Sequence, residues 1–181
     1  MIGNKLTCVQ EDRVEFLIWL ESLGLAVWVR ESLSLFAYPS ILAFHAVGLA
    51  FLVGGSAAIN LRLLGYADDL PLAAMKKFFP VIYAGFWVNA LTGGLLLIAS
   101  ATGMLTSVVF WLKLIFVGLG VATVLLIKIR VFGDEEVLES GTVPRIGRTL
   151  AIASLVFWVG AIVTGRLTAY ALLLTTTFGR T

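Results

Sequence analysis

Three side chains that can carry a positive charge lie more than one helical turn from either end of the long apolar stretches of this chain: His45, Lys113 and Arg166. All 11 Asp and Glu residues lie outside those stretches, so no carboxylate accompanies the three. A charge in hydrocarbon is costly unless it is paired, reaches water or meets a ligand. These positions are therefore the best starting point for a functional interpretation.

The residue types fit the binding of a heme or a quinone. Imidazole suits iron and guanidinium suits carboxylates, so His45 is a candidate axial ligand of heme b, with Lys113 and Arg166 on its propionates. A quinone fits nearly as well, because its carbonyl oxygens would accept hydrogen bonds from His45, Asn89 or Lys113. The chain has 1 His, so a six-coordinate heme would need Met, Lys or a partner subunit as its other ligand.

Each of these residues also has an ordinary role in a membrane helix. Lys113 and Arg166 can extend to the headgroups, and His45 and Asn89 can hydrogen-bond between helices. A protein-only metal site would need three or four ligands, and a proton pump would need buried carboxylates. We predict neither, and no nucleophile and base are placed for hydrolysis. Whether the protein is an enzyme stays open, with a non-enzymatic role favoured.

The composition is that of a membrane protein. The chain has 181 residues, of which 60% are hydrophobic, and a mean hydropathy of +1.01. Its net charge of +2 is small and its basic residues are scattered, which excludes a nucleic-acid partner. Its one cysteine, Cys8, can form no disulfide within the chain.

Four stretches are long enough to cross a hydrocarbon core of about 30 Å as helices. Helices are expected because strand-type alternation is absent and a helix satisfies its own backbone in lipid. The predicted fold is thus an all-α, four-helix transmembrane bundle. Its spans are residues 39–61, 80–101, 108–129 and 150–172.

The distribution of Lys and Arg predicts the orientation. The two charged loops hold seven of them, whereas the amino-terminal segment and the last residues hold four. The positive-inside rule then makes the charged loops cytoplasmic and places both termini outside. With this orientation His45, Asn89, Lys113 and Arg166 come from four different spans into one layer near the outer face, where Thr92 also lies.

The first residues do not show the basic and apolar regions typical of a cleaved signal peptide, so we expect no cleavage there and expect this part to lie on the membrane. Residues 14–29 are apolar but interrupted by Glu21, which favours an interfacial helix over a short fifth span. The predicted organisation is an amino-terminal segment over residues 1–37, the bundle over residues 38–174 and a tail over residues 175–181.

Small residues and a similarity between two segments of the chain bear on how the helices pack. Glycines such as Gly48, Gly93, Gly120 and Gly160 allow helices to approach closely, although a flat ligand would need the same clearance. Residues 85–94 and 156–165 match at five of ten positions. Either a duplicated hairpin or chance similarity between apolar segments explains that match.

Five short motifs along the chain are distinctive: Arg30-Glu-Ser-Leu-Ser-Leu-Phe-Ala-Tyr-Pro39, His45-Ala-Val-Gly48, Asn60-Leu-Arg-Leu-Leu-Gly65, Phe110-Trp-Leu-Lys113 and Gly165-Arg166-Leu-Thr-Ala-Tyr170. With these motifs the chain resembles a family of small bacterial four-span integral membrane proteins of unknown function. The resemblance covers essentially all of the chain after the first dozen residues, and implies four spans, a short amino-terminal helix and a bacterial inner membrane. The sequence departs from the family pattern at Asn60, where the family usually has Asp, which puts an Asp partner for Arg62 in doubt.

Three functions stay open at this point. The first is a redox-associated membrane subunit that binds heme b or quinone near the outer face. The second is a transporter for a small solute or anion, and the third is a non-catalytic scaffold or assembly partner. The expected partners are the lipid bilayer and either further copies of the chain or redox subunits.

Overall fold

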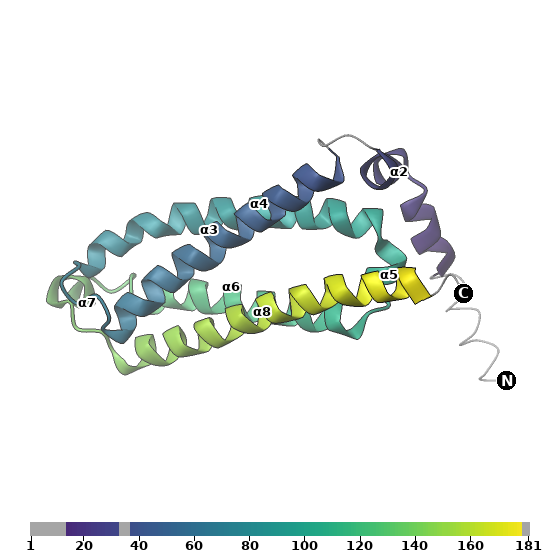
Figure 1. Ribbon diagram of the computed structural model, residues 1–181. Coiled ribbons are helices and arrows are strands. Elements are labelled where there is room, and N and C mark those ends of the chain that lie inside the picture. Colours follow the sequence, from purple (N-terminus) through teal and green to yellow (C-terminus); the bar gives the residue numbers. More distant parts are fainter. Residues whose placement is uncertain (1–13, 33–36, 179–181) are drawn as a thin grey trace.

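The computed structural model describes residues 14–32 and 37–178, and for residues 169 and 171–178 only the backbone. All regular secondary structure in this part of the chain is helical, with no strand (Figure 1). The predicted tail beyond residue 178, the first 13 residues and Cys8 lie outside it. After a helical segment over residues 14–21 come α2 (Gly24–Glu31), α3 (Tyr38–Leu64), the 3-10 helix η1 (Leu72–Lys77), α4 (Phe78–Ala99), α5 (Ala101–Leu105), α6 (Val108–Arg130), α7 (Glu135–Ser140) and α8 (Arg145–Phe178).

The four predicted spans are confirmed as α3, α4, α6 and α8. Within the described residues four helices are long and apolar enough to cross a membrane. The largest difference is at α8, which begins at Arg145 rather than at the predicted residue 150. The carbonyl of Pro144 accepts the first hydrogen bonds of that helix, so the helix starts in the polar region before it reaches hydrocarbon. Hydrophobicity locates the buried stretch, whereas hydrogen bonding sets the helix end.

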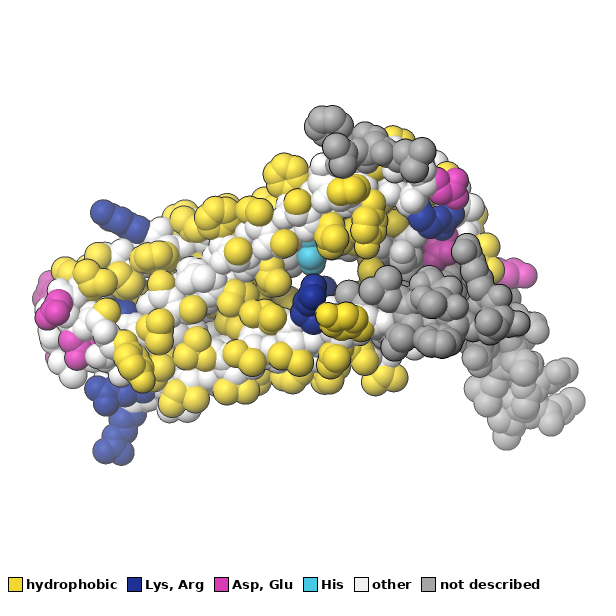
Figure 2. All heavy atoms as spheres, in the orientation of Figure 1, with side chains coloured by type: hydrophobic (Ala, Val, Ile, Leu, Met, Phe, Trp, Pro, Cys, Tyr) yellow, Lys and Arg dark blue, Asp and Glu magenta, His cyan; other side chains and the backbone are white. Residues whose placement is uncertain are grey.

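The bundle consists of two antiparallel hairpins laid side by side (Figure 1). In one, α3 packs along α4; in the other, α6 packs along α8, and α3 also contacts α8. The fourth edge of the bundle, between α4 and α6, is the least closely packed of these. Hydrophobic side chains cover the flanks, and charged side chains gather toward the two ends (Figure 2).

The two hairpins use their glycines differently. In the first, the backbones of α3 and α4 touch: a Cβ on Gly48 would lie 2.7 Å from the backbone nitrogen of Asn89. In the second, aromatic rings occupy the space above glycines. Trp158 of α8 lies on Gly120 of α6, and Phe116 of α6 lies on Gly160 of α8. Protein atoms therefore fill the clearance at these glycines, which is the packing role of small residues in membrane bundles.

The two segments with similar sequence, residues 85–94 and 156–165, do not place their equivalent tryptophans in the same environment. Trp87 and Trp158 occupy equivalent positions in the two matching segments. Trp87 is 62% exposed on the outside of α4, whereas Trp158 is 1% exposed between α8 and α6. Similar sequence in the two segments therefore does not produce similar packing of this tryptophan.

The predicted amino-terminal helix is present but divided into two pieces. The chain turns at Ser22 and Leu23, where the Ser22 hydroxyl donates to the carbonyl of Trp19. Neither eight-residue piece can cross a membrane, since eight residues of helix span about 12 Å. The structure thus gives no fifth span over residues 14–32.

The end of the bundle that carries α7 and η1 holds a buried arginine. Arg62 donates from Nη1 to Oδ1 of Asp68 at 3.1 Å and from Nε to the carbonyl of Leu70 at 2.6 Å. The doubt about an Asp partner for Arg62 was therefore misplaced, because the carboxylate comes from the following loop. Asn60, at the position where that partner was expected, instead donates to the Ser154 hydroxyl of α8.

Candidate functional site

The structure brings His45 of α3 against Asn89 and Thr92 of α4. Nδ1 of His45 lies 3.1 Å from the carbonyl oxygen of Asn89 and 3.2 Å from the Thr92 hydroxyl. A carbonyl oxygen only accepts, so Nδ1 carries the proton and donates it. The Asn89 side-chain amide in turn donates to the carbonyl of His45 at 2.8 Å. The two residues thus form a reciprocal pair of hydrogen bonds across the two helices.

Local sequence explains why this pair forms. Gly48 lies one turn after His45 and lets the backbone of α3 approach that of α4 at Asn89. Gly93 leaves room for the imidazole itself, since a Cβ there would lie 3.0 Å from Cε1 of His45. Thr92 gives its own proton to the carbonyl of Val88 at 2.6 Å, which leaves its oxygen to accept from His45.

Lys113 lies on the other hairpin, on α6, and is half-buried. Its aliphatic stem runs beside Gly165 of α8. A Cβ atom added to that glycine would lie 3.7 Å from Cε of the lysine. The ammonium is near enough to His45 for a Coulombic interaction between them. Among the residues the structure describes, no hydrogen bond or ion pair involves Lys113. Figure 2 shows histidine atoms and Lys or Arg atoms facing a hollow on this side of the molecule.

Arg166 is not brought into this group. Its side chain is exposed, and Nη2 lies 3.4 Å from the hydroxyl of Tyr170, one turn later on α8. The guanidinium also lies 5.5 Å from the centre of the Tyr170 ring, which is a cation-π contact. Of the four predicted positions, His45, Asn89 and Lys113 therefore share one region, while Arg166 lies on the outer surface of its own helix.

The donor set suits a hydrogen-bond acceptor better than a metal. No group of three or more His, Cys, Asp or Glu residues gathers anywhere in the described ranges. A histidine that binds a metal usually donates its other ring N–H to a carbonyl or carboxylate, as Nδ1 of His45 does here. Nε2, however, lies 3.5 Å from the amide nitrogen of Asn89. An iron at Nε2 would have to displace that amide, and the chain offers no second histidine.

Comparisons with protein-family models, with curated proteins and with solved structures found no match. Membership of the four-span bacterial family therefore stays a prediction from the motifs. Functional inference for this chain depends on the geometry of its own residues.

Two polar features of the bundle were not predicted as part of any site. Asn60 is fully buried, and its Oδ1 has no hydrogen-bond partner among the described residues, although its amide donates to Ser154 at 2.9 Å. Lys128 of α6 donates to the hydroxyl of Tyr83 on α4 at 3.1 Å. For the contact between Lys128 and Tyr83, the sequence indicated only a lysine at the end of a span. Such lysines are too common to predict a particular partner.

Proposed function

We propose that this protein is a redox-associated membrane subunit that binds a quinone between Lys113 and His45. The observation that carries the proposal is the half-buried ammonium of Lys113, which has no acceptor within the described part of the chain. An unpaired cation in a membrane layer is stabilised by a ligand that brings an oxygen acceptor. A quinone has two such oxygens and a lipid-soluble ring.

His45 and Asn89 would form the opposite wall of this site. Their reciprocal hydrogen bonds hold the imidazole in one orientation, so that wall is preorganised. A quinone carbonyl would accept a charge-assisted hydrogen bond from Lys113, the strongest donor available there. The ammonium would also favour the negative charge that a quinone gains on reduction, which is the link to redox chemistry.

Heme b is the less favoured cofactor for this site. The amide nitrogen of Asn89 lies 3.5 Å from Nε2 of His45, where iron would bind. Arg166, which was expected to hold a propionate, is exposed and contacts Tyr170 instead. A small anion would satisfy Lys113 equally well. The experiments below distinguish heme b and a small anion from a quinone.

The test compares Lys113→Gln with Arg166→Gln, which removes a basic group from the same layer but outside the site. Purified protein in mild detergent would be titrated with a short-chain ubiquinone, and the dissociation constant measured. We expect Lys113→Gln to weaken binding by about 10-fold to 100-fold, because a charge-assisted hydrogen bond contributes about 1.5–3 kcal/mol. Arg166→Gln should leave binding unchanged.

Three results would contradict the quinone proposal. Equal binding by wild type and Lys113→Gln would remove the residue on which it depends. A Soret band in the purified protein that His45→Ala abolishes would replace the quinone with heme. Lys113-dependent anion flux in liposomes, without quinone binding, would favour a transporter.

A further inference from the structure

A groove runs between α4 and α6, at the least closely packed edge of the bundle. Its middle part has a volume of about 230 Å³ and is lined by apolar side chains, among them Ile82, Phe86 and Val121. A wider part of about 890 Å³ continues from it toward the end of the bundle that carries α7. The two parts share Tyr83 and Leu125 in their linings, so they adjoin along the edge between α4 and α6, and we treat them as one groove.

The wide end of this groove is basic. Lys76 of η1 and Lys128 of α6 line it, and none of the acidic residues in the described part of the chain does. Lys128 is fixed there, since its Nζ donates to the Tyr83 hydroxyl and lies 4.9 Å from the centre of that ring. An ammonium has three donors, so Lys128 can still hydrogen-bond to a ligand. Both lysines are exposed and lie at the ends of membrane helices, at headgroup depth.

We propose that this groove binds an anionic phospholipid of the surrounding bilayer. The phosphate would lie between Lys76 and Lys128, and an acyl chain would follow the apolar part past Leu125 to Phe86. The argument is one of complementarity: the groove is positive at headgroup depth and apolar at the depth of the hydrocarbon. Basic pockets between membrane helices bind acidic lipid headgroups by the same combination.

This site is separate from the proposed quinone site. It uses neither Lys113 nor His45, and it lies on the edge between α4 and α6 rather than beside the contact of His45 with Asn89. The charge distribution of the loops predicts that its basic end faces the cytoplasmic leaflet. The two proposals can therefore fail independently.

The first test concerns the headgroup. Native mass spectrometry of the purified full chain would count retained phosphatidylglycerol and phosphatidylcholine, supplied in equal amounts in mixed micelles. We expect wild type to retain phosphatidylglycerol at least fivefold over phosphatidylcholine. The double variant Lys76→Gln/Lys128→Gln should lose that preference. Lys77→Gln, which removes a neighbouring lysine that does not line the groove, should keep it.

The second test concerns the acyl chain. Leu125→Trp places a large side chain in the groove, whereas Leu126→Trp adds the same bulk at a similarly exposed neighbour outside it. We expect Leu125→Trp to reduce phosphatidylglycerol retention at least threefold and Leu126→Trp to leave it unchanged. Retention that follows the lysines but ignores Leu125→Trp would show surface attraction only and overturn the groove. Equal retention of both lipids by wild type, or retention of phosphatidylglycerol by the double variant, would overturn the headgroup site.

Discussion

Gly48 and Gly85 set the distance between α3 and α4. An added Cβ on Gly85 would lie 2.7 Å from the backbone nitrogen of Leu52, and one on Gly48 would lie 3.0 Å from the carbonyl of Gly85. Backbone atoms cannot rotate out of the way as a side chain can. Any side chain at either position must therefore separate the two helices, and with them the contact of His45 with Asn89.

We expect Gly48→Ala to lower the free energy of unfolding by about 1–3 kcal/mol, the usual cost of overpacking. Gly54→Ala is the matched control, because a Cβ at this position of the same helix meets nothing within 4 Å. The control should stay within about 0.5 kcal/mol of wild type or gain stability from helix propensity. Unfolding by denaturant in mixed micelles measures both. Equal stability of the two variants would mean that the helices separate at little cost.

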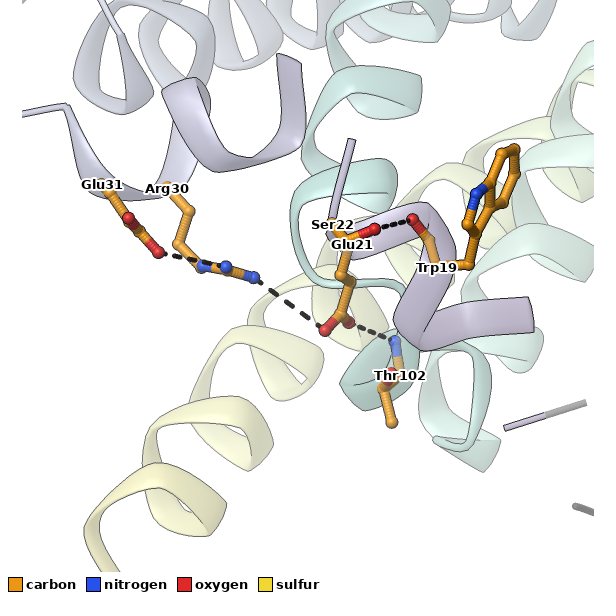
Figure 3. A network of polar contacts seen from close by, with 6 residues as sticks. All are labelled: Trp19, Glu21, Ser22, Arg30, Glu31 and Thr102. Atoms are coloured by element: carbon orange, nitrogen blue, oxygen red, sulfur yellow. Dashed lines mark hydrogen bonds and ion pairs between the residues drawn. The ribbon is translucent and has the colours of Figure 1, made fainter. Parts of the chain in front are cut away.

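Glu21 joins the amino-terminal helices to the bundle. Its Oε1 accepts from the backbone nitrogen of Thr102 at 2.6 Å, and its Oε2 lies 4.0 Å from Nη1 of Arg30 (Figure 3). Thr102 is the second residue of α5, whose first backbone N–H groups have no partner within that helix. A carboxylate from a distant segment therefore caps a helix that lacks a side-chain cap of its own.

We expect Glu21→Ala to speed hydrogen exchange of the Thr102 amide at least tenfold, because a hydrogen bond to a charged group contributes about 1.5–3 kcal/mol. Glu21→Gln retains an acceptor oxygen and should fall between wild type and Glu21→Ala. Glu31→Ala is the control, since Glu31 pairs with Arg30 but does not contact Thr102. Exchange measured on peptides that cover residues 101–105 reports all three. Unchanged protection in Glu21→Ala would show that α5 is held by other contacts.

At the scale of the whole molecule, the loops between the helices give the two ends of the bundle different charges. One end carries α7 and η1, and the other carries α2 and α5 (Figure 1). The seven basic residues of the charged loops belong to the first end, so the positive-inside rule predicts that this end faces the cytoplasm. Cysteine labelling tests this orientation directly, because Cys8 is the only cysteine to remove.

In a Cys8→Ser background, we expect Thr106→Cys to react with a membrane-impermeant maleimide in intact spheroplasts and Ser140→Cys to remain unlabelled. Thr106 lies between α5 and α6, and Ser140 ends α7 at the opposite end. Both residues are exposed, so accessibility in the folded chain does not separate them. Permeabilised spheroplasts should label both. The reverse pattern in intact spheroplasts would invert the orientation and move the basic end of the groove to the outer leaflet.

The four spans could be predicted because they depend on local composition, and the interfacial position of the amino-terminal part stays a prediction. Hydrocarbon thickness fixes how many apolar residues a span needs, and that number can be counted along the chain. The break at Ser22 was missed although Gly24 follows it closely, and a hydrogen bond from the Ser22 hydroxyl to Trp19 accompanies it. The partner of Arg62 was missed because the path of the following loop decides which carboxylate reaches it.

The candidate site was only partly predictable for a related reason. Depth in the membrane follows from position within a span, so sequence could place His45, Asn89, Lys113 and Arg166 in one layer. It could not tell which side of each helix faces a neighbour. The rotation of α8 directs Arg166 to Tyr170 and the outer surface, while Lys113 points past Gly165 toward the interior.

By itself, then, the sequence determined that this is a four-span membrane protein with uncompensated basic groups near one face, since hydrophobicity and charge are properties of each residue. Only the tertiary structure decided which helices touch. It paired His45 with Asn89, left Lys113 without an acceptor in the described chain and opened a groove beside Lys128. The physical reason is that lipid satisfies every apolar face equally well, so close packing at a few glycines, rather than hydrophobicity, chooses the partners.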